Sequence, residues 1–381
     1  MIQNINESTS VPATTQHAHP HLQLIPGIFM LGFLTLGAVF ALISPGLRDL
    51  PEGKDVITGE WAVTYEKTFN KGLPWRDTGI QAWGTLEYFA FQNGRPGVLV
   101  GKEGWLFTTE EFQFFKNEAQ ETRQKLETIQ QVQQQLKAQG TELVVALIPA
   151  KTRVYADKLG RYPMPSYTLK RYFSFRDGLL QAGIPAPDLL TPLIQARNSG
   201  EVFLHTDTHW TPFGASVVAE SVKTALDQLQ LNLPTTAFET RDSAEIQHSG
   251  DLLKYIPLGP YQDQGPQPDH FTEKVTEQAS TDSSALLGDA PDDASDLLGD
   301  SAGVPVALVG TSYSFNPKFH FEGALKQALQ VDVLNMALEG KGPMVPMQEY
   351  LKSSAWKDTP PKVVVWEIPE RFLPVHYEET P

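Results

Sequence analysis

Residues 205–214, HTDTHWTPFG, gather chemically capable side chains in a chain with nine histidines and no cysteine. On an extended backbone His205, Asp207 and His209 point to one face, because strand side chains alternate. Such a face could bind zinc or non-haem iron. It could instead supply a histidine base oriented by a carboxylate, or be a hydrogen-bonded strand end with no catalytic role.

A catalytic histidine needs a nucleophile, and the absence of cysteine makes serine the leading candidate. Gly-x-Ser occurs at Gly299–Ser301 and at Gly310–Ser312. Ser301 lies in an acidic loop with no strand before it, where a nucleophile would not be held in place. The triplet Gly310-Thr311-Ser312 directly follows the apolar run VPVALV, which places Ser312 on the turn where a buried strand ends. We therefore predict that Ser312 is the nucleophile and that its N–H faces an oxyanion.

In this interpretation His209 takes the proton of Ser312, and Asp207 fixes the imidazole tautomer. An aspartate two residues from its histidine reaches the ring only if the backbone bends. Thr211-Pro212 resembles an N-cap followed by proline at the first helical position, and this strand-to-helix transition could supply the bend. His205 then becomes a structural residue, and we expect neither a metal nor a cofactor.

Oxyanion donors are expected from loops at the ends of other strands, where ligands gather in parallel sheets. The candidate substrate or oxyanion residues are Tyr313, Asn335, Gly340 and Gly342.

Strand and helix patterns alternate along the chain and predict an α/β fold with a mostly parallel sheet flanked by helices. The expected strands are a hairpin at 97–107 and the runs 141–150, 201–210, 304–310, 331–335 and 362–369. The expected helices include 109–139, 172–181, the segment after Thr211 and the FEGALKQAL segment. The aromatic-rich segment 61–91 also reads as helical, with its aromatics facing a core.

Residues 22–43 contain no charged side chain and are long enough, at about 20 residues, to cross a bilayer as a helix. The stretch exceeds the apolar region of a signal peptide, which predicts an uncleaved transmembrane helix. We expect residues 1–21 to form a disordered tail, 60–376 a catalytic domain and 260–303 an acidic mobile insertion. The net charge of −15 argues against a nucleic-acid partner.

Five motifs occur in a characteristic order: GWLF, IPAKTRVYADKL, DTHWTPFGA, GTSYS and VVVWEIPERFL. With them, the chain from Gly97 to Leu373 resembles the alginate O-acetyltransferase family, in its membrane-anchored, single-domain type. The resemblance implies an SGNH-hydrolase-like domain and a triad of Asp207, His209 and Ser312.

The resemblance also implies transfer of acetyl groups to hydroxyls of an exported, alginate-like polysaccharide through an acetyl-serine intermediate. The implied partners are the polysaccharide acceptor, a membrane-bound O-acyltransferase that supplies acetyl, and other polysaccharide export proteins. The implied location is the bacterial inner membrane, with one N-terminal anchor and the catalytic domain in the periplasm. A basic groove of Lys151, Arg153 and Arg371 would offset the acidity of the protein toward an anionic polymer.

Two other functions fit the same residues. A carbohydrate acetylesterase would use the same triad with water as the acceptor, and the sequence does not separate it from a transferase because that choice depends on water exclusion. A non-catalytic polysaccharide-binding scaffold of an export complex would need no nucleophile.

Overall fold

The computed structural model describes residues 20–43, 50–73, 75–279 and 303–376. The chain divides into two compact units, Met1–Ala82 and Trp83–Pro381. The predicted start of the catalytic domain at residue 60 precedes this boundary. Of the tail predicted at 1–21, residues 1–19 lie outside the described part, and α1 begins at Pro20.

The first unit contains α1 (Pro20–Ile43), which coincides with the predicted transmembrane helix, and α2 (Glu60–Gly72). The described side chains of α1 are those of residues 24–40 and Ile43. Within the part of the chain that the structure describes, no helix combines the length and the apolar character needed to cross a membrane. The predicted membrane anchor is therefore not supported.

The helical interpretation of 61–91 is confirmed by α2 and by α3 (Arg76–Phe91). The expectation that its aromatics face a core holds for Tyr88, which packs against a buried cluster that includes Ile256, but it is wrong for α2 and for the two exposed tryptophans. No described residue of α2 is buried, and Trp75 and Trp83 are exposed. Trp61 instead stacks on Tyr65, its neighbour one helical turn away. The aromatic spacing therefore produces contacts along one helix face.

The second unit is built on a four-stranded sheet in the order β3-β8-β6-β7. Its strands are β3 (Glu142–Ile148), β8 (Val363–Pro369), β6 (Val306–Val309) and β7 (Val333–Asn335). Every pairing is parallel, so all four carboxyl ends meet at one edge. The predicted parallel sheet is confirmed, and its continuous apolar strands reflect burial on both faces.

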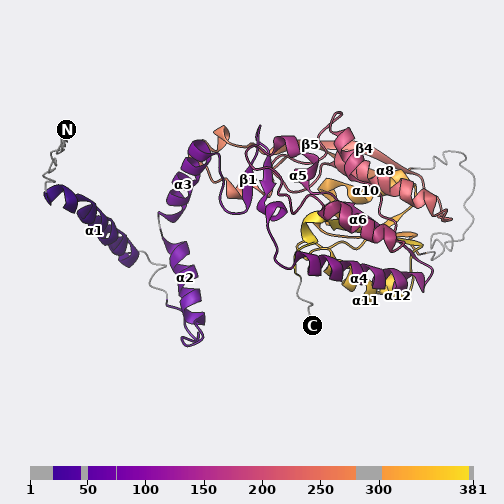
Figure 1. The fold of residues 1–381 in the computed structure, drawn as a ribbon, viewed down its shortest axis with the longest axis horizontal. Helices are drawn as coiled ribbons and strands as arrows, with labels where there is room; N and C mark the ends of the chain where they lie inside the picture. The colour runs from indigo at the N-terminus through magenta and orange to yellow at the C-terminus, as the bar shows by residue number, and fades with distance from the viewer. Residues whose placement is uncertain (1–19, 44–49, 74, 280–302, 377–381) are drawn as a thin grey trace, which may run out of the picture. The chain divides into compact units, whose positions relative to one another are not determined.

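Helices cover this sheet, with α4, α11 and α12 grouped along the lower side of the view and α8 and α10 on the other (Figure 1). Their bounds are α4 (Glu118–Lys137), α5 (Lys151–Val154), α6 (Arg171–Gln181), α7 (Leu190–Ala196), α8 (Pro212–Gln228), α9 (Ser312–Phe315), α10 (Phe321–Leu329), α11 (Met344–Lys352) and α12 (Ser354–Lys357). The helix predicted from 109 begins at Glu118, because a separate 3-10 turn occupies Thr109–Phe112.

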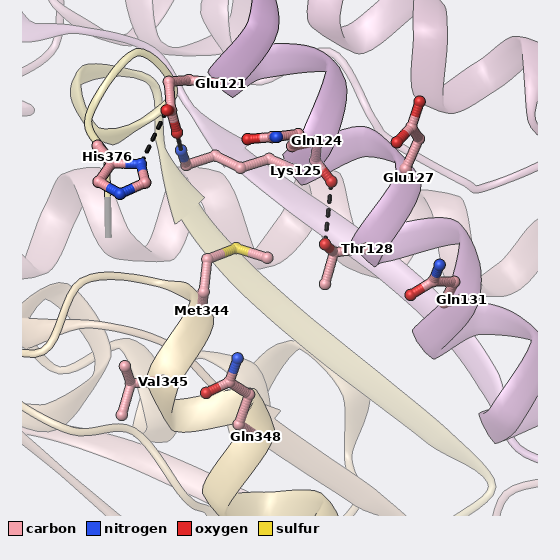
Figure 2. Close-up of a pocket in the computed structure, with 10 residues that line it drawn as sticks. All are labelled: Glu121, Gln124, Lys125, Glu127, Thr128, Gln131, Met344, Val345, Gln348 and His376. Atoms are coloured by element: carbon pink, nitrogen blue, oxygen red, sulfur yellow. Dashed lines mark hydrogen bonds and ion pairs between the residues drawn. The ribbon is translucent and has the colours of Figure 1, made fainter. Parts of the chain in front are cut away.

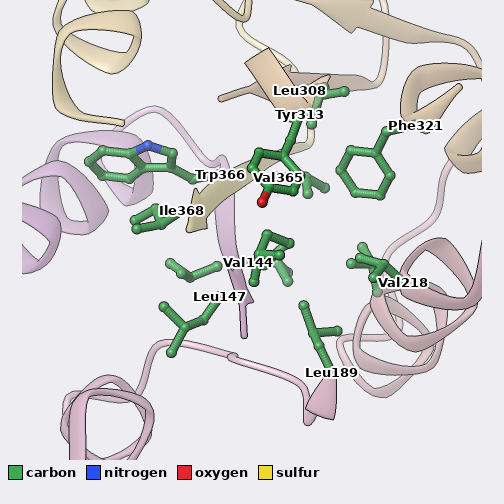
Figure 3. Packing of buried hydrophobic residues seen from close by; sticks show 14 of the residues in the cluster. Val144, Leu147, Leu189, Val218, Leu308, Tyr313, Phe321, Val365, Trp366 and Ile368 are labelled. Carbon is green, nitrogen blue, oxygen red and sulfur yellow. The ribbon is translucent and has the colours of Figure 1, made fainter. Parts of the chain in front are cut away.

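The core lies between these layers, where side chains of the central strands meet those of the helices (Figure 3). Val144 from β3 and Val365 from β8 are fully buried, and Phe321 from α10 and Val218 from α8 pack into the same cluster. Burying each such side chain contributes roughly 1.5–3 kcal/mol. This packing gives the strand ends a rigid base.

Two antiparallel hairpins complete the second unit. The predicted hairpin is confirmed as β1 (Val98–Val100) and β2 (Leu106–Thr108). The other, β4 (Phe238–His248) with β5 (Asp269–Gln278), was not predicted. Since β5 lies within 260–303, the expectation of a mobile loop is wrong for that part, while 280–302 lie outside the described residues. Its half-exposed, charge-rich sequence hid the strand, although Phe271, Thr272, Val275 and Thr276 favour extended structure.

Candidate active site

Residues 205–209 form a tight loop, so the predicted strand at 201–210 is wrong. Phe203 and Trp210 make an isolated antiparallel bridge, which folds the segment back on itself. Thr211 then caps α8 by accepting a hydrogen bond from the N–H of Gly214, as its sequence predicted. The bend that Asp207 needs to reach its neighbour therefore comes from a closed loop rather than from a strand end.

A continuous hydrogen-bonded chain joins Ser312, His209 and Asp207. The Ser312 Oγ lies 2.7 Å from His209 Nε2, and His209 Nδ1 lies 2.6 Å from Asp207 Oδ1. The backbone N–H of His209 also donates to Asp207 Oδ1 at 2.9 Å. The imidazole stacks on Phe319 at a centroid distance of 4.5 Å. These contacts hold the ring between the serine and the carboxylate.

The second oxygen of Asp207 is bound by the last residue of β4 and by a residue of the segment that follows it. His248 Nε2 lies 2.7 Å from Asp207 Oδ2, and the N–H of Asp251 donates to the same oxygen at 3.1 Å. Burial alone would raise the pKa of Asp207, but hydrogen bonds from His209 and His248 outweigh it and hold the pKa well below its usual range. Asp207 therefore remains ionised and can stabilise an imidazolium.

The serine lies at the start of α9, on the turn that follows β6. Beneath this turn is Glu367 of β8, fully buried, whose Oε2 accepts from the Thr311 N–H at 2.6 Å and from Ser314 Oγ at 3.0 Å. Burial raises the pKa of Glu367 to about 7, against the opposing hydrogen bonds from Thr311 and Ser314. Gly310 cannot carry a Cβ here, since it would lie 2.4 Å from Glu367 Oε2.

Lys151 supports the loop from below and does not line a substrate groove, so that prediction is wrong. Its ammonium donates to the carbonyl oxygens of Leu106, His205 and Asp207 at 2.7–2.9 Å. Burial lowers the pKa of Lys151 to about 8. The group is therefore still mainly charged at neutral pH, with its three N–H donors used internally.

Three other predicted substrate residues are also used internally. Arg153 is paired with buried Glu370 at 2.6 Å. Tyr313 is buried, and its hydroxyl donates to the Thr208 carbonyl at 2.5 Å. Asn335 Nδ2 donates to the Ser314 carbonyl at 2.8 Å, so its amide supports the serine turn instead of an oxyanion. Their polar groups have partners within the protein, which the sequence could not reveal.

The remaining predicted residues meet at one cavity of about 570 Å³. Asp207, His209 and Ser312 line it together with Gly340, Gly342 and Arg371. Both glycines have positive φ, at 71° and 64°, a region that other residues rarely adopt. The structure thus brings the serine, its base and a glycine loop to one cavity at the carboxyl edge of the sheet.

His205, Asp207 and His209 do not form the shared ligand set that the metal alternative requires. The His205 ring contacts Glu201 at 2.6 Å and packs on Trp105, away from the other two. Asp207, His209 and Asp251 do form a compact group. However, both oxygens of Asp251 accept hydrogen bonds from Thr208, and both oxygens of Asp207 accept the bonds described above. This arrangement favours a hydrogen-bonded cluster.

A second cavity, of about 420 Å³, lies between α4 and α11 (Figure 2). Glu121 lies there between Lys125 and His376, whose Nδ1 is 2.8 Å from its carboxylate. Serine is absent from the residues that line this cavity. Its ion pairs provide no nucleophile activated by a base, so the cavity at Ser312 is the candidate active site.

Sequence reasoning missed His248, Asp251, Asp269 and Glu367. Asp269 accepts the backbone N–H groups of His205 and Thr206, which ties the β5 strand to the loop. A useful signal for Glu367 was present: a lone acidic residue inside the apolar run VVVWEIP, where a buried charge needs partners. The others lie in charge-rich segments and have no comparable signal.

The fold and this arrangement define an SGNH-hydrolase-like domain. The family described as "SGNH hydrolase-like domain, acetyltransferase AlgX" matches residues 98–370. The chain belongs to this family, in agreement with the resemblance seen in its motifs.

Similar proteins include two described as probable alginate O-acetylase AlgJ. One, from Pseudomonas syringae pv. tomato, is 40% identical over 93% of this chain and 89% of its own length. The other, from Pseudomonas aeruginosa, is 42% identical over 84% of this chain and 81% of its own length. Among solved structures, the O-acetyltransferase domain of Pseudomonas putida AlgJ matches with a TM-score of 0.66 and 40% identity, covering 74% of this chain and 94% of that domain.

Proposed function

We propose that this chain is an O-acetyltransferase that moves acetyl groups onto hydroxyls of an alginate-like polysaccharide through an acetyl-Ser312 intermediate. The single observation that carries the proposal is the unbroken chain of hydrogen bonds from Ser312 Oγ through His209 to Asp207, open to a cavity. The identity of the transferred group and of the acceptor is inferred from the names of the relatives, alginate O-acetylase and O-acetyltransferase domain.

In the first half-reaction Ser312 Oγ attacks the carbonyl carbon of the acetyl donor, and His209 Nε2 takes the hydroxyl proton. As the first residue of α9, Ser312 has an N–H without an intrahelical acceptor, which can bind the oxyanion. The backbone N–H of Gly340 or Gly342 is a second candidate donor from the opposite loop. Collapse of the tetrahedral intermediate breaks the bond to the donor, which leaves with the proton from His209.

In the second half-reaction an acceptor hydroxyl gives its proton to His209 and attacks the acetyl-serine. The tetrahedral intermediate then releases the acetylated sugar, and Ser312 Oγ regains the proton. Asp207 stays ionised throughout and stabilises each transient imidazolium. Atoms and charge balance without a metal or another cofactor.

The proposal includes a cellular setting. The domain works in the periplasm on a polymer in export, receives acetyl from a membrane-bound O-acyltransferase and acts beside other export proteins. A membrane anchor at 22–43 is not part of this proposal.

The test supplies a small acetyl ester with and without oligomannuronate and measures acetylated sugar and free acetate separately. We expect sugar acetylation that is lost in Ser312→Ala and kept in Ser199→Ala, an exposed serine outside the cavity. Acetate release that oligomannuronate does not change, with no acetylated sugar, would identify an esterase. A wild type that produces neither acetylated sugar nor acetate would fit a non-catalytic scaffold. Acetylation that persists in Ser312→Ala would show that another residue carries the acetyl group.

A further inference from the structure

The cavity at Ser312 contains a buried cation that the acetyl-transfer steps do not use. Arg371 lines the cavity and exposes only 7% of its surface. Its Nε and Nη1 atoms have no hydrogen-bond partner among the described residues. Leaving a buried charged donor unpaired is costly, so this guanidinium needs a partner that the folded chain does not provide.

The nearest acidic side chain does not provide that partner. Glu110 Oε2 lies 3.7 Å from Arg371 Nε, beyond hydrogen-bond distance, and its side chain is 56% exposed. An ion pair at this separation, with one partner held in solvent, contributes little.

The other carboxylates nearby, of buried Glu111 and half-buried Asp251, are committed to other donors. Glu111 accepts the backbone N–H groups of Lys151 and Thr152, and Asp251 accepts both donors of Thr208. The acids around Arg371 therefore offset its charge without satisfying its N–H groups.

Aromatic rings fix the orientation of the guanidinium. Its central carbon lies 5.5 Å from the ring centre of Tyr313 and 4.8 Å from that of Phe372. Contacts of this kind hold a planar cation in place, so little ordering is needed when an anion binds. Lys254, exposed at the rim of the same cavity, adds a second positive charge.

We propose that Arg371 binds the carboxylate of a uronate residue in the acceptor chain and so positions the sugar hydroxyl at the acetyl-serine. The inference rests on the proposed function and names the group by which this site recognises its polymer. A guanidinium matches a carboxylate with paired N–H donors. Asp251 and Glu339, which also line the cavity, would repel a more highly charged group such as a phosphate dianion.

The test measures equilibrium binding by calorimetry, so it does not depend on catalysis. The full chain is titrated with oligomannuronate and with the same oligosaccharide after its carboxyl groups are reduced to alcohols. We expect the wild type to prefer the carboxylated form and Arg371→Gln to lower that preference about ten- to a hundredfold. Arg371→Lys, which keeps the charge but not the planar fork, should retain part of it.

Lys357→Gln is the matched control, because it removes one positive charge from an exposed site on α12. It should leave the preference unchanged. Equal binding of both oligosaccharides by the wild type, or an unchanged preference in both folded Arg371 variants, would overturn the inference. Failure of the proposed function is distinguishable, because it would abolish acetyl transfer while this binding preference remained.

Discussion

The two sides of the active site are held in place in different ways. The base lies on an irregular loop, 205–209, which is supported by side chains from the β4–β5 hairpin and its connection and by Lys151. The nucleophile lies on a short turn directly after a central strand, supported by Glu367 of the neighbouring strand. The base side therefore depends on many distant contacts, and the nucleophile side mainly on the sheet.

The two sides also treat a buried carboxylate in opposite ways. Asp207 is surrounded by donors from two histidines and two backbone N–H groups, so its pKa is well below its usual range. Burial dominates at Glu367, whose pKa is raised to about 7. The same side-chain chemistry thus provides a permanent charge on one side and a titratable support on the other.

Asp207→Asn should have the largest effect. The amide cannot hold the imidazole in the required tautomer, and we expect the acetyl-transfer rate to fall by about 10⁴-fold. Steady-state transfer to oligomannuronate measures the effect, with Asp358→Asn at an exposed position as the control. A loss below about tenfold would contradict a role for this carboxylate.

Lys151→Met should destabilise the base side most. It removes the donor from three carbonyl oxygens, and the free energy of unfolding should fall by about 3 kcal/mol or more. Urea unfolding measures the change. The exposed Lys102→Met should cost at most about 0.5 kcal/mol. Equal effects in the two variants would show that the buried ammonium does not support the loop.

Glu367→Gln should change how stability depends on pH. Because the folded-state pKa is raised from 4.5 to about 7, the native state holds a proton that the unfolded chain releases between these values. The free energy of unfolding should therefore fall as pH rises through this window, by up to about 3 kcal/mol from this group. Urea unfolding at pH 5 and pH 8 should show a smaller drop in the variant. The same drop in both proteins would refute this assignment.

His248→Phe should have a smaller effect, confined to turnover. The substituted ring can still pack against Phe271 and Phe319, but it cannot donate to Asp207. We expect kcat to fall about tenfold with little change in KM, and His248→Gln, whose amide can donate, to recover part of the loss. If Gln and Phe were equally impaired, His248 would act by packing alone.

The sequence predicted those parts of the site that local patterns encode. Ser312 after an apolar strand and Thr211-Pro212 at a helix start are each recognisable from a segment of only a few residues. The supports of Asp207 and Thr311 come from 41 to 56 residues away, so no local pattern links them. Lys151 was wrongly assigned to a substrate groove, because its burial depends on the loop 205–209, which is distant in the sequence and covers its side chain. The parallel sheet was predictable from its continuous apolar strands, whereas β5 was hidden by charged residues on an exposed hairpin.

Detection of a covalent adduct tests most directly whether Ser312 carries the acetyl group. The full chain is treated with a small acetyl ester or a sulfonyl fluoride, digested and analysed by mass spectrometry. We expect one adduct, on the peptide containing Ser312, which is absent in Ser312→Ala and strongly reduced in His209→Ala. An adduct on Ser301, or labelling of Ser312 that does not depend on His209, would contradict it.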